Sequence, residues 1–115
     1  MSYIEYMTKQ KSYTIAQLEE ANLIAKSSRG NYCDKMRNSI IIPTIDSKGN
    51  VVCFDYYIME RTQLYKYPNS DNFVRSNHLY SFNLAVRSEK KSVIIVSSYE
   101  DYFKLLGLGI TNVVA

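Results

Sequence analysis

Residues 92–115, SVIIVSSYEDYFKLLGLGITNVVA, decide the fold class of this chain. The apolar, β-branched run 93–96 predicts a buried strand, and residues 99–106 have the pattern of a helix that ends at the following glycines. Residues 112–115 predict a second strand. A strand, a helix and a strand in this order form a βαβ unit, in which the strands are parallel and the crossover is right-handed. We therefore expect an α/β protein, with a small mixed sheet and helices followed by this βαβ unit at the C-terminus.

The second predicted strand is apolar up to the last residue of the sequence. Val113, Val114 and Ala115 finish it without a polar tail or a third strand. An apolar strand edge without a neighbour is prone to pair with another chain. We expect a partner to cover this edge through Val113 and Val114, either a second copy of the chain in a homodimer or a catalytic subunit.

Three patterns place elements upstream of the βαβ unit. A capping-box signature at residues 14–17, followed by apolar residues at helical spacing, predicts a helix over residues 14–25. Residues 39–45 and 51–59 are β-branched and aromatic runs separated by turn residues, which predicts a β-hairpin. A further helix is expected from about Ser81.

The composition excludes several classes of protein. A chain of 115 residues with 46% apolar and 22% charged residues fits one domain and differs from disordered sequences. The net charge of +3 permits a nucleic-acid or acidic partner without requiring one. Two cysteines and one histidine are too few for a structural zinc site, so we expect no metal and no cofactor. No apolar run suits a signal peptide or a membrane span, and we expect a cytoplasmic protein that does not contact a membrane.

Several short motifs stand in the order in which they occur in one known family. From about residue 13 to residue 115 the chain resembles the catalytic core of bacterial DnaG-type DNA primases. The motifs are YTIAQLEEANLI (13–24), MRNSIIIPTID (36–46), GNVVCF (49–54), KYPNS (66–70), FVRSNHLY (73–80), and IVSSYED (95–101) followed by GLGITNVVA (107–115). The resemblance implies a single primase-core-like domain over residues 1–115. Within it we expect an N-terminal extension (1–12), a part like the primase N-terminal subdomain (13–91) and a partial, truncated toprim-like βαβ unit (92–115).

The departures from the family concern its catalytic residues. The resemblance implies a catalytic glutamate at the end of the first toprim strand and an Asp-x-Asp pair downstream that holds a divalent metal. In this sequence that strand ends in Ser97 and Ser98, and no Asp-x-Asp pair follows. A serine hydroxyl is neither a practical base at neutral pH nor a charged magnesium ligand. We therefore predict no catalytic residue, no metal site and no catalysis by this chain alone.

The basic positions of the family are better preserved. The resemblance implies that Arg37, Lys66 and Arg75 lie along the groove that handles template or nucleotide. The charge distribution agrees, because residues 26–37 carry a net charge of +3 and residues 61–91 carry +4, whereas the rest of the chain carries −4. An ordinary solvated surface is the alternative interpretation of the same charges.

Four tyrosines are candidate contact residues. Tyr65 and Tyr67 flank Lys66, which suits stacking on bases beside a phosphate contact, although alternating tyrosines in a strand are also common as half-buried packing. Tyr56 and Tyr57 stand where the family has a glycine-rich turn. Because they point to opposite faces of an extended strand, we expect at least one of them to be exposed as part of a partner surface.

These observations lead to one expected function and two alternatives. We expect an accessory protein of DNA replication, such as one of a mobile element, that binds single-stranded template or primer-template. It would dock on a polymerase, primase or helicase that performs the chemistry of primer synthesis. The first alternative is a fragment or split half of a primase whose metal-binding half lies elsewhere. The second is a protein-interaction module that does not bind nucleic acid.

Overall fold

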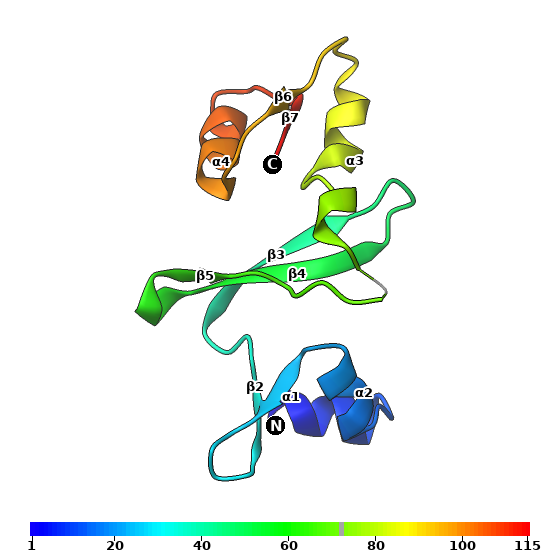
Figure 1. Cartoon of the computed structure of the whole chain (residues 1–115), viewed down its shortest axis with the longest axis vertical. Coiled ribbons are helices and arrows are strands. Elements are labelled where there is room, and N and C mark those ends of the chain that lie inside the picture. Colours follow the sequence, from blue (N-terminus) through cyan, green and yellow to red (C-terminus); the bar gives the residue numbers. More distant parts are fainter. Residues whose placement is uncertain (72) are drawn as a thin grey trace. The chain divides into compact units, whose positions relative to one another are not determined.

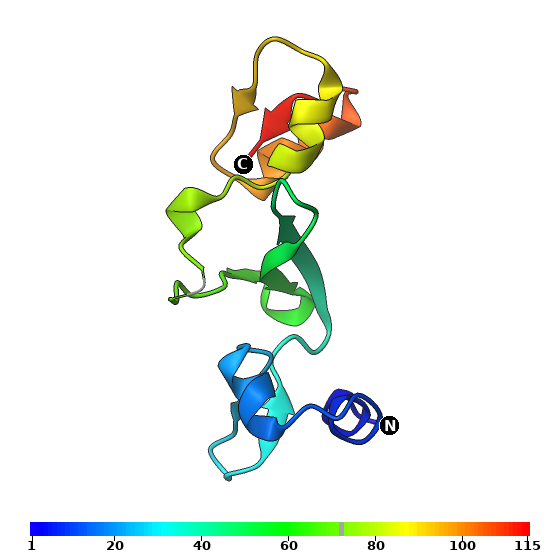
Figure 2. The ribbon, with the colours of Figure 1, turned by 90° about the vertical axis from the view of Figure 1, so that its right-hand side faces the viewer.

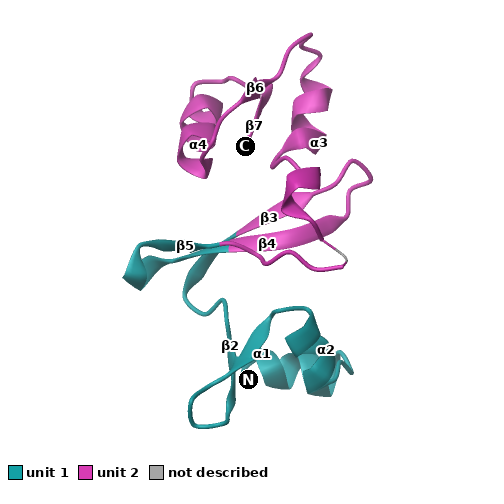
Figure 3. Ribbon diagram, in the orientation of Figure 1, with its two compact units in different colours: residues 1–41, 56–65 teal, residues 42–55, 66–115 magenta. Residues whose placement is uncertain are grey.

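The computed structural model describes residues 1–71 and 73–115, and their contacts divide them into two units (Figure 3). The first unit contains residues 1–41 and 56–65, and the second contains residues 42–55 and 66–115. The single domain expected from the sequence stays a prediction. No helix in the described part of the chain is long and apolar enough to cross a membrane.

The first unit begins with helical turns and a small hairpin. Its helices are α1 (Tyr3–Glu5), which continues into a π-helical turn, and α2 (Ile15–Glu20). Strands β1 (Ile24–Lys26) and β2 (Tyr32–Asp34) pair antiparallel. Leu18 and Ile24 are buried and form the core of this part.

The helix predicted over residues 14–25 is correct at its start and too long at its end. The Thr14 side chain accepts a hydrogen bond from the backbone N–H of Gln17, and the Gln17 side chain accepts one from the Thr14 N–H, so the predicted capping box is present. The helix ends at Glu20 because Asn22 adopts a left-handed conformation, with φ of 60°. Residues 24–26 then form β1 instead of continuing the helix.

The predicted hairpin is present as part of a three-stranded sheet. Its strands are β3 (Ser39–Ile45), β4 (Val51–Ile58) and β5 (Gln63–Tyr65), in the order β3-β4-β5. The Asp46 carboxylate accepts hydrogen bonds from two backbone N–H groups in the turn between β3 and β4, and Gly49 supplies the positive φ that the turn requires. Strand β5 pairs antiparallel with the end of β4 and forms an edge of the sheet.

The second unit contains the predicted βαβ arrangement. Strands β6 (Ile94–Ile95) and β7 (Val113–Val114) are parallel and are joined through α4 (Tyr99–Gly107). Ser98 is the N-cap of α4, since its hydroxyl accepts a hydrogen bond from the Asp101 N–H. Helix α3 (Phe82–Ala85), which begins after Ser81 as predicted, and α4 both pack on β7, which lies between them (Figures 1 and 2).

The burial predicted for the two strands is reversed. Ile94 and Ile95 of β6 are 40% and 69% exposed, whereas Val113 and Val114 of β7 are 1% and 0% exposed. The reason is that β7 carries helices on both sides, while β6 makes its main contacts with β7 alone within the described residues. The last residue also has a neighbour, because Ala115 and Tyr80 exchange two backbone hydrogen bonds. Any role of Val113 and Val114 in partner binding stays a prediction, but their side chains are covered in this structure.

Candidate nucleic-acid interface

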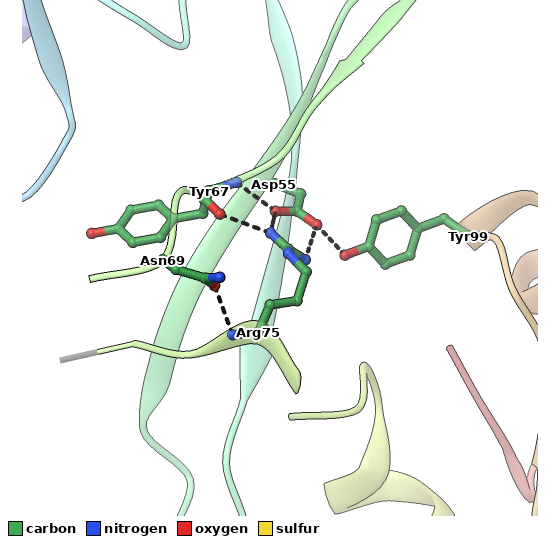
Figure 4. A network of polar contacts seen from close by, with 5 residues as sticks. All are labelled: Asp55, Tyr67, Asn69, Arg75 and Tyr99. Carbon is green, nitrogen blue, oxygen red and sulfur yellow. Dashed lines mark hydrogen bonds and ion pairs between the residues drawn. The ribbon is translucent and has the colours of Figure 1, made fainter. Parts of the chain in front are cut away.

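A buried carboxylate organises the polar centre of the second unit. Asp55 lies on β4 and is fully buried. Its two carboxylate oxygens accept hydrogen bonds from both terminal nitrogens of Arg75, at 2.7 and 3.0 Å, so the pair is bidentate (Figure 4). The Tyr67 backbone N–H also donates to Asp55, at 2.8 Å, and the Tyr99 hydroxyl donates to the same carboxylate.

Arg75 closes a loop onto this carboxylate. Its Nη2 also donates to the Tyr67 carbonyl oxygen at 3.0 Å, and its backbone N–H donates to the Asn69 side-chain oxygen at 2.9 Å. Because Tyr99 is the first residue of α4, the network ties strand β4, the chain around Tyr67 and the start of α4 together. We call Asp55, Tyr67, Arg75 and Tyr99 the Asp55 cluster.

The electrostatics of the Asp55 cluster keep the ion pair charged. Burial acts to raise the pKa of Asp55, but hydrogen bonds from Arg75, Tyr99 and the Tyr67 N–H outweigh burial and hold that pKa below its ordinary value. The hydrogen bond to Asp55 raises the pKa of Arg75. Burial, followed by the hydrogen bond to Asp55, raises the pKa of Tyr99, so this phenol stays protonated and acts as a donor.

This geometry predicts that acid weakens the fold through Asp55. A carboxyl group whose pKa is lower in the folded state stabilises the protein above its unfolded pKa, about 4, and that stabilisation is lost as the pH falls towards the folded pKa. We expect the free energy of unfolding, measured with urea between pH 7 and pH 3, to fall less steeply in Asp55→Asn than in the wild type. Identical slopes for the two proteins would contradict this role of Asp55.

Arg75 has a carboxylate partner in the Asp55 cluster, and its predicted contact with template or nucleotide stays a prediction. Its side chain is 34% exposed, but its guanidinium is directed at Asp55, which already neutralises its charge. By contrast, Arg37, in the turn before β3, and Lys66, just after β5, are exposed. Within the described part of the chain neither has a salt-bridge partner. Arg37 belongs to the first unit and Lys66 to the second.

The four candidate tyrosines have different environments. Tyr65 stacks on Tyr56, with 5.1 Å between the ring centroids and 7° between the ring planes. Tyr67 packs edge-on against Phe73, at 5.6 Å. The role predicted for Tyr56 and Tyr57 in a partner surface stays a prediction. Tyr56 is only 9% exposed and Tyr57 is half-buried. The reason is that β5 pairs beside them and Tyr65 covers the Tyr56 ring.

Sequence reasoning missed Asp55 and Tyr99 as partners of Arg75. One signal for Asp55 was available, because an aspartate is unusual inside a strand that is otherwise apolar and aromatic. Asp55 also shares a face with Cys53, two residues earlier, and a carboxylate on a buried face requires a cation nearby. The sequence held no comparable signal that the partner is Arg75 or that Tyr99 completes the set.

Comparison with known families decides the ancestry of the chain. The family described as DNA primase catalytic core, N-terminal domain, matches residues 1–86. The chain belongs to this primase-core family. The match begins at residue 1, so the similarity to the family includes residues 1–12, which lie before the first of the sequence motifs.

Individual primases extend the likeness to most of the chain. It is 38% identical over 111 residues to a DNA primase of Clostridium acetobutylicum, which covers 93% of this chain and 18% of that protein. It is 34% identical over 104 residues to a DNA primase of Legionella pneumophila, which covers 86% of this chain and 18% of that protein. The chain therefore spans about a fifth of the length of these relatives.

Solved structures show the same fold. The DnaG primase catalytic domain bound to ssDNA has a TM-score of 0.80 at 21% identity, covering 96% of this chain and 38% of that one. The E. coli primase catalytic core has a TM-score of 0.81 at 21% identity, with the same coverage. The predicted α/β class and the resemblance to the DnaG primase core are thus confirmed.

The residues that follow β6, where the resemblance implies a catalytic glutamate, do not fit a divalent metal. Ser97 is exposed, and the Ser98 hydroxyl accepts the Asp101 N–H as a helix cap. Glu100 and Asp101 are exposed on the first turn of α4. Across residues 1–71 and 73–115, no three His, Cys, Asp or Glu side chains gather in a metal-binding arrangement. We derive no chemical step through a metal at this position.

Proposed function

We propose that this primase-core protein binds single-stranded template or primer-template and supports primer synthesis without catalysing it. It docks on a replication polymerase, primase or helicase that performs the chemistry. A cytoplasmic location, a homodimer and an origin in a mobile element belong to the same proposal.

The proposal rests on two exposed basic side chains, those of Arg37 and Lys66. The resemblance implies that Arg37 and Lys66 stand where a primase core has basic residues, and no carboxylate among the described residues neutralises either side chain. A cation that has no internal partner is available to a phosphate, and each phosphate contact releases condensed counterions from the strand. A solved DnaG primase catalytic domain of the same fold is bound to ssDNA, which supports the same kind of ligand here.

The non-catalytic part of the proposal rests on the end of β6. Ser97 and Ser98 supply hydroxyls where phosphoryl transfer in this type of fold uses a carboxylate. The Ser98 hydroxyl is already engaged as the cap of α4. A serine at this position neither binds magnesium as an anion nor exchanges a proton efficiently at neutral pH.

A specific observation favours the alternative of a primase fragment or split half. Ile94 and Ile95 of β6 are largely exposed, although the strands of a parallel sheet are normally covered on both faces. Further strands and helices supplied by another segment or another chain would cover them. Under this alternative the chain also binds template, and activity appears when the complementary half is added. The third possibility, an interaction module, differs from both because it does not bind single-stranded nucleic acid.

Salt dependence of binding tests the proposed cations. We expect the chain to bind a single-stranded oligonucleotide near 50 mM salt, with an affinity that falls linearly with the logarithm of the salt concentration. Arg37→Ala and Lys66→Ala should each lower the log–log slope by about 0.7, the single-strand increment for one neutralised phosphate. Fluorescence anisotropy titrations at four salt concentrations measure these slopes.

The matched control is Lys48→Ala. Lys48 is an exposed cation of the turn between β3 and β4, and we assign it no contact with the oligonucleotide. Its slope should equal that of the wild type. Unchanged slopes in both test variants, or no binding by the wild type, would remove the basis for the proposed function and favour the pure interaction module.

A further inference from the structure

Tyr56 and Tyr65 form a fixed aromatic stack on the first unit. They are cross-strand partners of the antiparallel pair β4–β5, and their rings lie 5.1 Å apart and nearly parallel. Tyr56 is buried, whereas Tyr65 is half-buried and lies on the edge strand of the sheet. Because Tyr56 covers one face of the Tyr65 ring, the exposed area of Tyr65 lies on its other face and its rim.

Two polar contacts hold the Tyr65 ring in place. Its hydroxyl donates to the Gln63 side-chain oxygen at 3.1 Å, and Arg61 Nη1 lies within donating distance of the same hydroxyl, at 3.5 Å. A ring fixed by a stack on one side and by hydrogen bonds at its tip loses little conformational freedom when a ligand stacks on it. Such preorganisation increases affinity without any additional contact.

Arg61 adds a positive charge at the rim of this ring. It is exposed, and among the residues that the structure describes no carboxylate forms a salt bridge with it. Its contact with the Tyr65 hydroxyl keeps the guanidinium beside the ring. An aromatic face with an adjacent unpaired cation is the combination that sequence-tolerant binders of single strands use, because every base has a stacking face and every nucleotide has a phosphate.

We propose that Tyr65, supported by Tyr56 and accompanied by Arg61, is a subsite for one unpaired nucleotide, whose base stacks on Tyr65 and whose phosphate pairs with Arg61. The subsite rests on the proposed function and deepens it. It also separates the two tyrosines that flank Lys66. Tyr65 is the stacking residue, whereas Tyr67 is committed to its edge contact with Phe73 and to the Asp55 cluster.

The experiment uses the full chain and a short oligonucleotide that carries one 2-aminopurine. Stacking of this base on an aromatic ring quenches its fluorescence. The wild type should quench it. Tyr65→Ala should bind about 5- to 150-fold more weakly, in line with the loss of one base stacked on an aromatic side chain. Tyr65→Phe keeps the ring face and should stay close to the wild type in affinity and quenching.

Two further variants keep the test decisive if Tyr65→Ala is poorly folded. Tyr65→Leu still covers Tyr56 with apolar bulk but has no aromatic face, and it should lose quenching. Arg61→Ala should keep quenching and lower the salt slope by about 0.7.

The matched control is Tyr13→Ala, which removes an exposed tyrosine that is distant from Tyr65 in the sequence. This variant should behave as the wild type. Parallel titrations with a DNA and an RNA oligonucleotide show whether template or primer occupies the subsite.

The outcomes separate this inference from the proposed function. If the wild type binds the strand and Tyr65→Leu binds and quenches equally well, the subsite is wrong and the proposed function stands. If the wild type does not bind either oligonucleotide, both are wrong. If Tyr65→Leu loses quenching while Tyr65→Phe keeps it, the stacking role is established, and the Arg61→Ala slope decides the phosphate contact.

Discussion

Arg75→Ala is expected to lower the free energy of unfolding by about 2–4 kcal/mol, because it leaves a fully buried carboxylate without its cation. Removal of one member of a buried ion pair typically costs about 3–5 kcal/mol, and the partial exposure of Arg75 places the expected cost towards the lower end. Arg75→Lys keeps the charge but not the bidentate geometry, so it should lie between Arg75→Ala and the wild type. Urea unfolding measured at neutral pH gives these values.

A double-mutant cycle shows whether the loss belongs to the pair. In the Asp55→Leu/Arg75→Leu protein the uncompensated charge is gone, so it should be more stable than either single variant. Arg87→Ala is the control, since Arg87 is exposed and forms no salt bridge with any described residue, and it should change stability by less than about 0.5 kcal/mol. Additive losses at Asp55 and Arg75 would contradict the coupling.

The second large effect concerns primer synthesis. With Mg²⁺ and nucleotides, the chain alone should make no primer, because Ser97 follows β6 where a carboxylate is expected and because the described residues do not gather three side chains suited to a metal. Ser97→Glu should remain inactive as well. One restored carboxylate does not create a metal site where the neighbouring ligands are missing.

Local patterns in the sequence were sufficient for several elements. Three of these patterns are the capping box at Thr14 and Gln17, the β-branched and aromatic runs of β3 and β4, and the helical pattern of α4 that ends at glycines. Each depends on residues within a few positions of one another. The hairpin of β1 and β2 was missed because its two strands are only three residues long and partly polar.

Long-range pairing explains the larger errors. Asp55 meets Arg75 twenty positions later and Tyr99 forty-four positions later, and no periodicity connects such residues. Strands β6 and β7 are equally apolar in sequence, so the sequence did not show that the helices pack on β7 and leave β6 exposed. The positive charge of Arg75 is evident in the sequence, but the direction of its side chain depends on a partner that only the fold brings near.

Primer synthesis on a single-stranded template, assayed with and without a replication polymerase or primase from the same source, tests the central claim most directly. The proposed function predicts no product with the chain alone, the usual product with the enzyme alone, and more primers when the chain is added to the enzyme. Lys66→Ala should weaken that increase, while Lys48→Ala should not. Metal-dependent primers made by the chain alone, or enzyme activity that the chain leaves unchanged, would contradict it.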